Sequence, residues 1–167
     1  MFIQSDIVIK QYPNMLVITN AGGLPVGVDT DNILSVNSMP RSRRISEVLQ
    51  KTGHVDKSGQ GIDRMFAISI SEGKPIPDYS LTDEWQVCLR LYGTIQDPAL
   101  LLLIHDIQHN RSTTEKLNAF DLLALYRVSR GESIRNVDTA TLKKLLSQGL
   151  LVETGNGIKL TPPCMRI

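Results

Sequence analysis

The distribution of apolar residues predicts three β-strands in the first half of the chain. Residues 6–10 alternate around two isoleucines, and residues 15–19 form a largely apolar run. Residues 12–14 lie between these stretches and contain Pro and Asn, which favour a turn, so we expect a β-hairpin. A third alternating stretch over 85–92 predicts another strand of the same sheet.

Apolar residues at helical spacing predict helices between these strands and after them. Two short amphipathic helices lie on either side of the glycine-rich stretch 57–61. Asp97 and Pro98 are the residue types of an N-cap and a first helical position, so a third helix begins there and ends by Asn110.

The last fifty residues follow a different pattern. Asn118 predicts the N-cap of a helix, 133–138 a short second helix, and Thr139 the N-cap of a third helix over 140–148. Two apolar runs within 150–160 flank a glycine-containing turn and predict a β-hairpin. This order is typical of a winged helix-turn-helix, whose second long helix normally enters the DNA major groove.

Polar residues on this last helix are the candidates for DNA contact. The lysines suit phosphates, and the hydroxyls and the amide suit base edges. The expected DNA-binding residues are Thr139, Thr141, Lys143, Lys144, Gln148 and, on the hairpin, Lys159. The alternative is a winged helix that serves only protein contacts or dimerisation.

Glycines mark two candidate ligand-facing segments. Gly59 and Gly61 precede a helix, and a helix N-terminus behind flexible backbone favours a phosphate. The alternative is a tight turn before an ordinary helix. Gly22 and Gly23 follow the second strand, where they either permit a ligand to approach the backbone or simply end the strand.

Two further clusters are weaker candidates. Arg41, Arg43 and Arg44 have paired donors that suit phosphates, although such a cluster is often only a solvated face. His105 and His109 lie four residues apart, which is metal-ligand spacing, but the chain has no HExxH motif, so we expect no metal site.

Composition places few limits on function. The 167 residues suffice for one core of normal size or two small ones, and the net charge is +1. Residues 118–167 contain seven Lys and Arg against four Asp and Glu, so the C-terminal third is the more basic part. Two distant cysteines, no long apolar run and no secretory signal predict a soluble protein of a reducing cytoplasm, with no membrane partner.

The motifs of 6–91, taken in order, resemble the bacterial family named as the C-terminal region of RecG-type ATP-dependent DNA helicases. This family is a divergent branch of the gyrase, histidine-kinase and MutL (GHKL) ATPase fold. The resemblance rests on 16–25 (LVITNAGGLP), 39–41 (MPR), 58–65 (SGQGIDRM) and 73–77 (GKPIP), and the ordered set is more specific than any one motif. Members typically continue into a winged helix, often follow a Schlafen-type domain, and are commonly described as transcriptional regulators.

The resemblance implies a nucleotide site formed by two segments. In the wider ATPase fold, residues after the second strand contact adenine, and the later glycine loop wraps the phosphates. The residues so implied to bind ATP with Mg²⁺ are Asn20, Gly22, Gly23, Arg41, Ser58, Gly59, Gln60 and Gly61.

Departures from the family pattern argue against catalysis by this chain. The catalytic Glu and the Mg²⁺-binding Asn of the fold belong to a helix ahead of the hairpin, and this sequence starts after that point. Asn20 stands where active ATPases have Asp, and Ala21 where the family usually has Pro. No GxxxxGK[ST] loop is present, so helicase activity has no support. We therefore expect no catalytic residues here.

The sequence as a whole predicts an α+β protein. We expect a partial GHKL-like α/β sandwich, with a mixed sheet and helices on one face, followed by a winged helix-turn-helix. The expected domains are 1–95, a bridging helix and linker over 96–117, and the winged helix over 118–167.

The expected function is DNA-binding transcriptional regulation, with an incomplete ATP-binding domain and with double-stranded DNA and a second copy of the chain as partners. One alternative is an ATPase completed by a missing N-terminal part. The other is a protein-interaction module that pairs through an exposed sheet edge.

Overall fold

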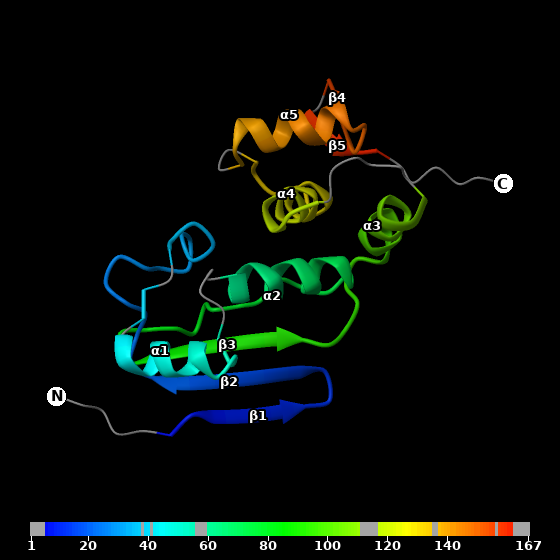
Figure 1. Cartoon of the computed structure of the whole chain (residues 1–167). Coiled ribbons are helices and arrows are strands. Elements are labelled where there is room, and N and C mark those ends of the chain that lie inside the picture. The colour runs from blue at the N-terminus through cyan, green and yellow to red at the C-terminus, as the bar shows by residue number, and fades with distance from the viewer. Residues whose placement is uncertain are drawn as a thin grey trace. The chain divides into compact units, whose positions relative to one another are not determined.

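The computed structural model of the chain describes residues 6–37, 39–40, 42–55, 60–110, 117–134, 137–155 and 157–161. Over these residues it has five helices, a three-stranded antiparallel sheet and a β-hairpin near the C-terminus (Figure 1). The predicted α+β class is therefore confirmed.

Internal contacts divide the chain into two compact units. Unit 1 comprises Met1–Met65 and Ile76–Thr94, and unit 2 comprises Phe66–Pro75 and Ile95–Ile167. The division into domains 1–95, 96–117 and 118–167 stays a prediction.

Unit 1 is built on the three-stranded sheet. Its strands lie in the order β1 (Val8–Tyr12), β2 (Met15–Ala21) and β3 (Gln86–Tyr92). The prediction of a mixed sheet is wrong for the part of the chain that the structure describes, where both pairings are antiparallel. The physical reason is the two-residue turn after Tyr12, which reverses the chain between β1 and β2, while β3 runs against β2 on its other side.

The two helices between β2 and β3 in the sequence differ in how many of their side chains are buried. α1 (Arg43–Lys51) has Ser42 as its N-cap and buries none of its residues, so its apolar side chains Ile45 and Val48 are exposed. α2 (Gln60–Ser71) buries Phe66 and Ile70. The chain passes from unit 1 to unit 2 within α2.

Unit 2 is a helical unit completed by a hairpin. It contains α3 (Pro98–Asn110), α4 (Ala119–Ser129), α5 (Thr139–Ser147), β4 (Leu151–Thr154) and β5 (Gly157–Leu160). α4 packs against α3, α5 and β5, and α5 also packs against β4. Its most deeply buried large apolar side chains are Ile70, Leu100, Leu103, Ile104, Leu125, Leu145 and Leu150.

Helix caps explain where the helices of unit 2 begin. Asn118 is the N-cap of α4 as predicted, and it forms a capping box with Asp121. Asp97 Oδ1 accepts from Leu100 N at 2.9 Å, which confirms the predicted start of α3. The prediction that Thr139 is the N-cap of α5 is wrong. Asp138 has this role because its carboxylate accepts from the N–H groups of the first turn, and Thr139 is the first helical residue.

The predicted short helix over 133–138 is not seen in the part that the structure describes. Residues 133–134 and 137–138 are not helical, and Val137 N donates to Ile134 O at 2.9 Å, which closes a turn. Residues 135 and 136 lie outside the description. The observed order from α4 is thus helix, turn, helix and hairpin.

Candidate functional site

The paired glycines after β2 lie directly against the segment that leads into β3. Gly22 N donates to Trp85 O at 2.6 Å, and Gly23 N donates to Glu84 O at 3.0 Å. A Cβ atom on Gly23 would lie 2.6 Å from Asp83 O, which is closer than any real contact. Close packing of two backbone segments therefore accounts for Gly23, whereas Gly22 has a positive φ of 82°, a conformation that favours glycine. The N–H groups of both glycines already have acceptors.

The other residues of the expected nucleotide site lie elsewhere in unit 1. Asn20 is exposed near the end of β2, and Gln60 and Gly61 are exposed in the first turn of α2. Apart from its chain neighbours and the backbone of its own helix, no described atom lies within 4 Å of a Cβ built on Gly61, so the described residues leave the space beside it open. Arg41, Ser58 and Gly59 lie outside the described residues. Nucleotide binding by this set stays a prediction.

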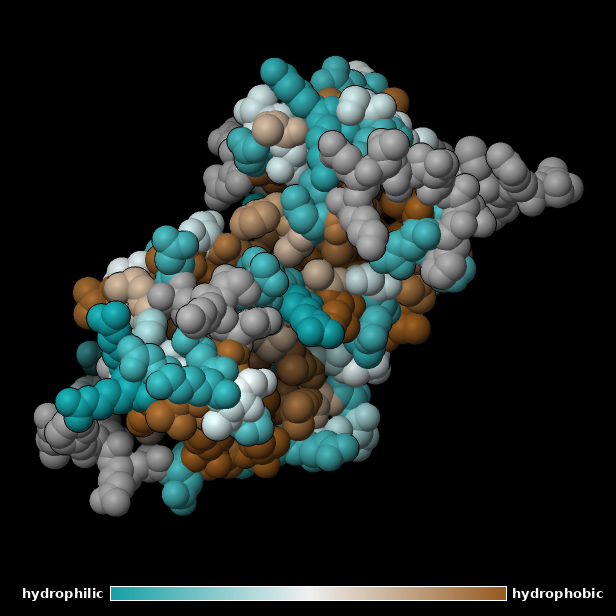
Figure 2. All heavy atoms as spheres, in the orientation of Figure 1, coloured by the Kyte–Doolittle hydropathy of each residue, from teal (hydrophilic) through white to brown (hydrophobic). Residues whose placement is uncertain are grey.

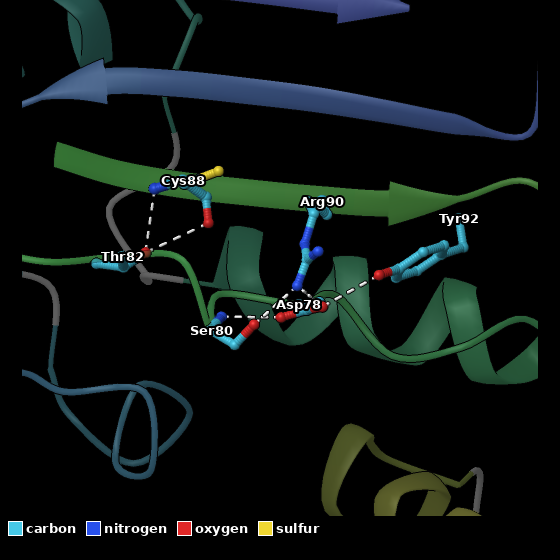
Figure 3. A network of polar contacts seen from close by, with 6 residues as sticks. All are labelled: Asp78, Ser80, Thr82, Cys88, Arg90 and Tyr92. Carbon is cyan, nitrogen blue, oxygen red and sulfur yellow. Dashed lines mark hydrogen bonds and ion pairs between the residues drawn. The ribbon is translucent and has the colours of Figure 1, made fainter. Parts of the chain in front are cut away.

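A polar network that the sequence did not predict joins β3 to the segment preceding it (Figure 3). Asp78 Oδ2 accepts from Arg90 Nη2 at 2.5 Å and from Tyr92 OH at 3.1 Å, and Asp78 Oδ1 accepts from Ser80 N at 2.8 Å. Arg90 Nη2 also donates to Ser80 Oγ at 2.8 Å. Arg90 and Tyr92 lie two apart, hence on one side of a strand, but no sequence pattern indicates that Asp78 returns to them.

This network shifts the pKa values of Asp78 and Tyr92 in opposite directions. Burial raises the pKa of Asp78, but hydrogen bonds from Ser80 and Tyr92 and the charge of Arg90 outweigh burial, so the pKa lies below its usual value. Burial and the hydrogen bond to Asp78 raise the pKa of Tyr92. At neutral pH the carboxylate is charged and the phenol protonated, as their hydrogen bond requires. These hydrogen bonds and the ion pair hold the segment 78–80 against β3, which is a structural role.

The exposed face of α5 is the site that the DNA-binding prediction concerns. Thr139, Ala140, Lys143 and Ser147 are exposed, while Leu145 on the opposite side is completely buried. Thr139 and Lys143 belong to the predicted set. Ala140 and Ser147 share this exposed face but were not in the predicted set, although helical spacing counted from Leu145 also places them opposite it.

Lys144 lies on the flank of α5 and has a partner inside unit 2. Its Nζ lies 2.7 Å from Asp121 Oδ2, and the Asp121 side chain is only 1% exposed. The same oxygen accepts from Asn118 N at 2.9 Å. Lys144 therefore connects α5 to the first turn of α4. Thr141 and Gln148 are also half-buried on this flank.

The hairpin presents the remaining predicted residue. Lys159 is exposed on β5, opposite the exposed Val152 of β4. Since β5 packs on α4 and β4 packs on α5, the hairpin is held beside both helices. Lys159 and the exposed face of α5 thus belong to one compact unit.

The described residues contain no cluster suited to a metal ion and no membrane-spanning helix. No group of three or more His, Cys, Asp or Glu side chains is arranged to hold a metal ion in that part of the chain. None of the helices described is both long and apolar enough to cross a membrane.

Comparison with known families identifies the family of this chain. The profile of the family described as "Putative ATP-dependent DNA helicase recG C-terminal" matches residues 4–91, just over half of the 167 residues. The chain belongs to this family. The match spans β1, β2, α1, α2 and β3 up to Leu91. It therefore covers most of unit 1 together with the segment Phe66–Pro75 of unit 2, and it stops before α3.

A solved structure extends the comparison beyond the RecG C-terminal region. The chain is similar in fold to the DIP2311 protein from Corynebacterium diphtheriae, with a TM-score of 0.64 and 19% sequence identity. The match covers 88% of this chain and 32% of that protein, so this chain spans about a third of its length. Because 88% exceeds the share of either unit, the likeness includes residues of both. Among curated proteins, none matches the chain.

Proposed function

We propose that this member of the RecG C-terminal family is a DNA-binding transcriptional regulator in which unit 2 is a winged helix-turn-helix. The observation that carries the proposal is the exposed face of α5, where Lys143 lies among the small side chains of Thr139, Ala140 and Ser147. Small side chains let a helix approach the floor of the major groove, and a lysine beside them neutralises a phosphate.

The hairpin supports the same assignment. Lys159 is exposed on β5, and the β4–β5 hairpin packs on α4 and α5, as the wing of such a domain does. A lysine on a wing would bind the DNA backbone beside the groove that α5 enters. Two phosphate contacts from separate elements would fix the orientation of the domain on the duplex.

Lys144 receives a different role in this proposal. Its ammonium binds a buried carboxylate, and taking it away from Asp121 would leave that charge unpaired. We assign Lys144 to holding α5 against α4, and the DNA contact to Lys143.

Nucleotide binding by unit 1 is the second candidate function. The open space beside the exposed Gly61 at the start of α2 favours it, and the family description names an ATP-dependent enzyme. The amides of Gly22 and Gly23 contribute less, because both already bind backbone carbonyl oxygens.

The test is a titration of the full chain into fluorescent duplex DNA of random sequence at several salt concentrations. Lys143→Ala and Lys159→Ala should each weaken binding and lower the slope of log affinity against log salt by about one, because each removes one phosphate contact. Fluorescence anisotropy reports the affinity.

Lys51→Ala is the matched control. It also removes one positive charge, from an exposed side chain of α1 in unit 1 that belongs to no candidate binding set. If Lys51→Ala weakened binding as much as Lys143→Ala, net charge alone would explain the effect and the proposed interface would be rejected. Repeating the titration with ATP and Mg²⁺, together with calorimetry of nucleotide binding, tests the second candidate separately.

A further inference from the structure

The two edges of the sheet in unit 1 differ in whether another segment of the described chain covers them. At the outer edge of β3, Asp78 and Arg90 exchange backbone hydrogen bonds of 3.0 and 2.9 Å, and Asp83 N donates to Gln86 O. Between these points the Thr82 hydroxyl accepts from Cys88 N at 3.0 Å and donates to Cys88 O at 3.3 Å (Figure 3). The edge of β3 is therefore covered by the segment that precedes it.

The outer edge of β1 has no such cover. In the part of the chain that the structure describes, no segment pairs with this side of β1, and all five of its residues are exposed. Ile9 is 63% exposed and Ile7, just before the strand, is 65% exposed. Figure 2 shows hydrophobic residues at the surface where Figure 1 draws β1. We refer to this side of β1 as the open edge.

The backbone groups that face the open edge follow from hydrogen bonds elsewhere in the sheet. Gly22 N donates to Trp85 O and Gly93 N to Asn14 O, so the even-numbered residues of β2 bond to β3 and the odd-numbered ones bond to β1. Their partners on β1 are even-numbered. The N–H and C=O groups that point outward are therefore those of Ile7, Ile9 and Gln11.

We propose that the open edge binds the open edge of a second copy of this chain, antiparallel and around a two-fold axis that passes through Val8. In this register Ile7 lies opposite Ile9 of the other copy, so outward-facing groups meet outward-facing groups. Asp6 then lies opposite Lys10, and the symmetry forms this oppositely charged pair twice.

Neighbouring registers lack this complementarity. Moving the axis to Ile9 places Lys10 opposite Val8 and Asp6 opposite Tyr12. Moving it to Lys10 places two lysines opposite each other, and like charges directly opposite are unfavourable. The apolar residues fit the same register, because Ile7 and Ile9 of both copies form one cluster that continues the row through Ile18 of β2. The charges thus select a self-complementary partner and one alignment.

The proposal is tested by the mass of the full chain in the absence of DNA, measured by sedimentation equilibrium over a range of concentrations. Wild type should form a dimer. Lys10→Glu or Asp6→Lys alone should weaken the dimer roughly tenfold or more, because two attractive pairs become repulsive. The double variant Asp6→Lys with Lys10→Glu restores the opposite charges and should recover most of the affinity.

A backbone variant tests the edge itself. Ile9→Pro removes a donor that points outward, so it should abolish the dimer while the β1–β2 ladder and the unfolding midpoint of the monomer are kept. Val8→Pro is the contrasting variant, since its N–H faces β2 and its loss should unfold the hairpin. A monomer at every concentration would overturn the proposal, as would a dimer that Ile9→Pro and the charge exchange leave unchanged. Because no step uses DNA, failure of the DNA-binding function would not alter this result.

Discussion

At Gly23 the packing of two backbone segments leaves no room for a side chain. Asp83 O would lie 2.6 Å and Glu84 Cα 2.9 Å from an added Cβ. We expect Gly23→Ala to lower the free energy of unfolding by about 1–3 kcal/mol, the range for an overpacked site. Urea unfolding followed by the fluorescence of Trp85, the single tryptophan, measures the change beside the substitution.

Gly61→Ala is the control for this substitution. Among the described residues beyond its chain neighbours and its own helix backbone, nothing lies within 4 Å of the added methyl group. Since the residue is helical, alanine should be neutral or stabilise by up to about 1 kcal/mol. Equal losses at both positions would contradict the packing explanation of Gly23.

Asp78 gives unit 1 a dependence on acid. Its pKa is lowered in the folded chain from the usual 3.8, so its contribution to stability is complete above that value and is lost as the pH falls through the lower, folded value. Wild type should therefore lose stability below about pH 4, and the difference between wild type and Asp78→Asn should shrink there. Unfolding curves at a series of pH values measure both. Glu47→Gln, at an exposed ion pair, should change stability little at any pH.

At the scale of elements, two adjacent lysines of α5 differ in their expected contribution to stability. Lys144→Ala leaves the buried Asp121 without its cation and should destabilise unit 2 by about 3–5 kcal/mol. Lys143→Ala changes an exposed side chain and should cost less than about 0.5 kcal/mol. Thermal unfolding of the two variants is the comparison, and similar midpoints would show that the pair with Asp121 contributes little.

The elements themselves could largely be predicted from the sequence. Alternation gave the strands, helical spacing gave the helices, and Asn118 and Asp97 marked two starts correctly. The start of α5 was misplaced because Asp138 and Thr139 are both capping residue types, and only the backbone geometry decides between them. The role of Lys144 could not be predicted, since its partner lies 23 residues away in sequence.

At the scale of the whole molecule, the sequence predicted the features that short motifs encode and did not predict contacts between segments distant in sequence. Resemblance to the RecG C-terminal family was recognisable from ordered motifs and is confirmed over 4–91. The antiparallel return of Asp78 to Arg90 was not recognisable, because the intervening loop has no periodicity and the pairing is tertiary. The DNA-facing residues stay a prediction, although the exposure of Lys143 and Lys159 agrees with it.

The segment 78–83 that covers β3 also limits how far the three-stranded sheet can grow by adding copies of this chain. A protein with two free strand edges can add copies indefinitely, which is how fibres form. Here, among the described residues, one edge of the three-stranded sheet is closed by the chain itself, so a copy that joins through β1 offers no further edge of this sheet for another copy. Growth of this sheet from copy to copy would therefore end at its first step, although β1 itself remains exposed in the monomer.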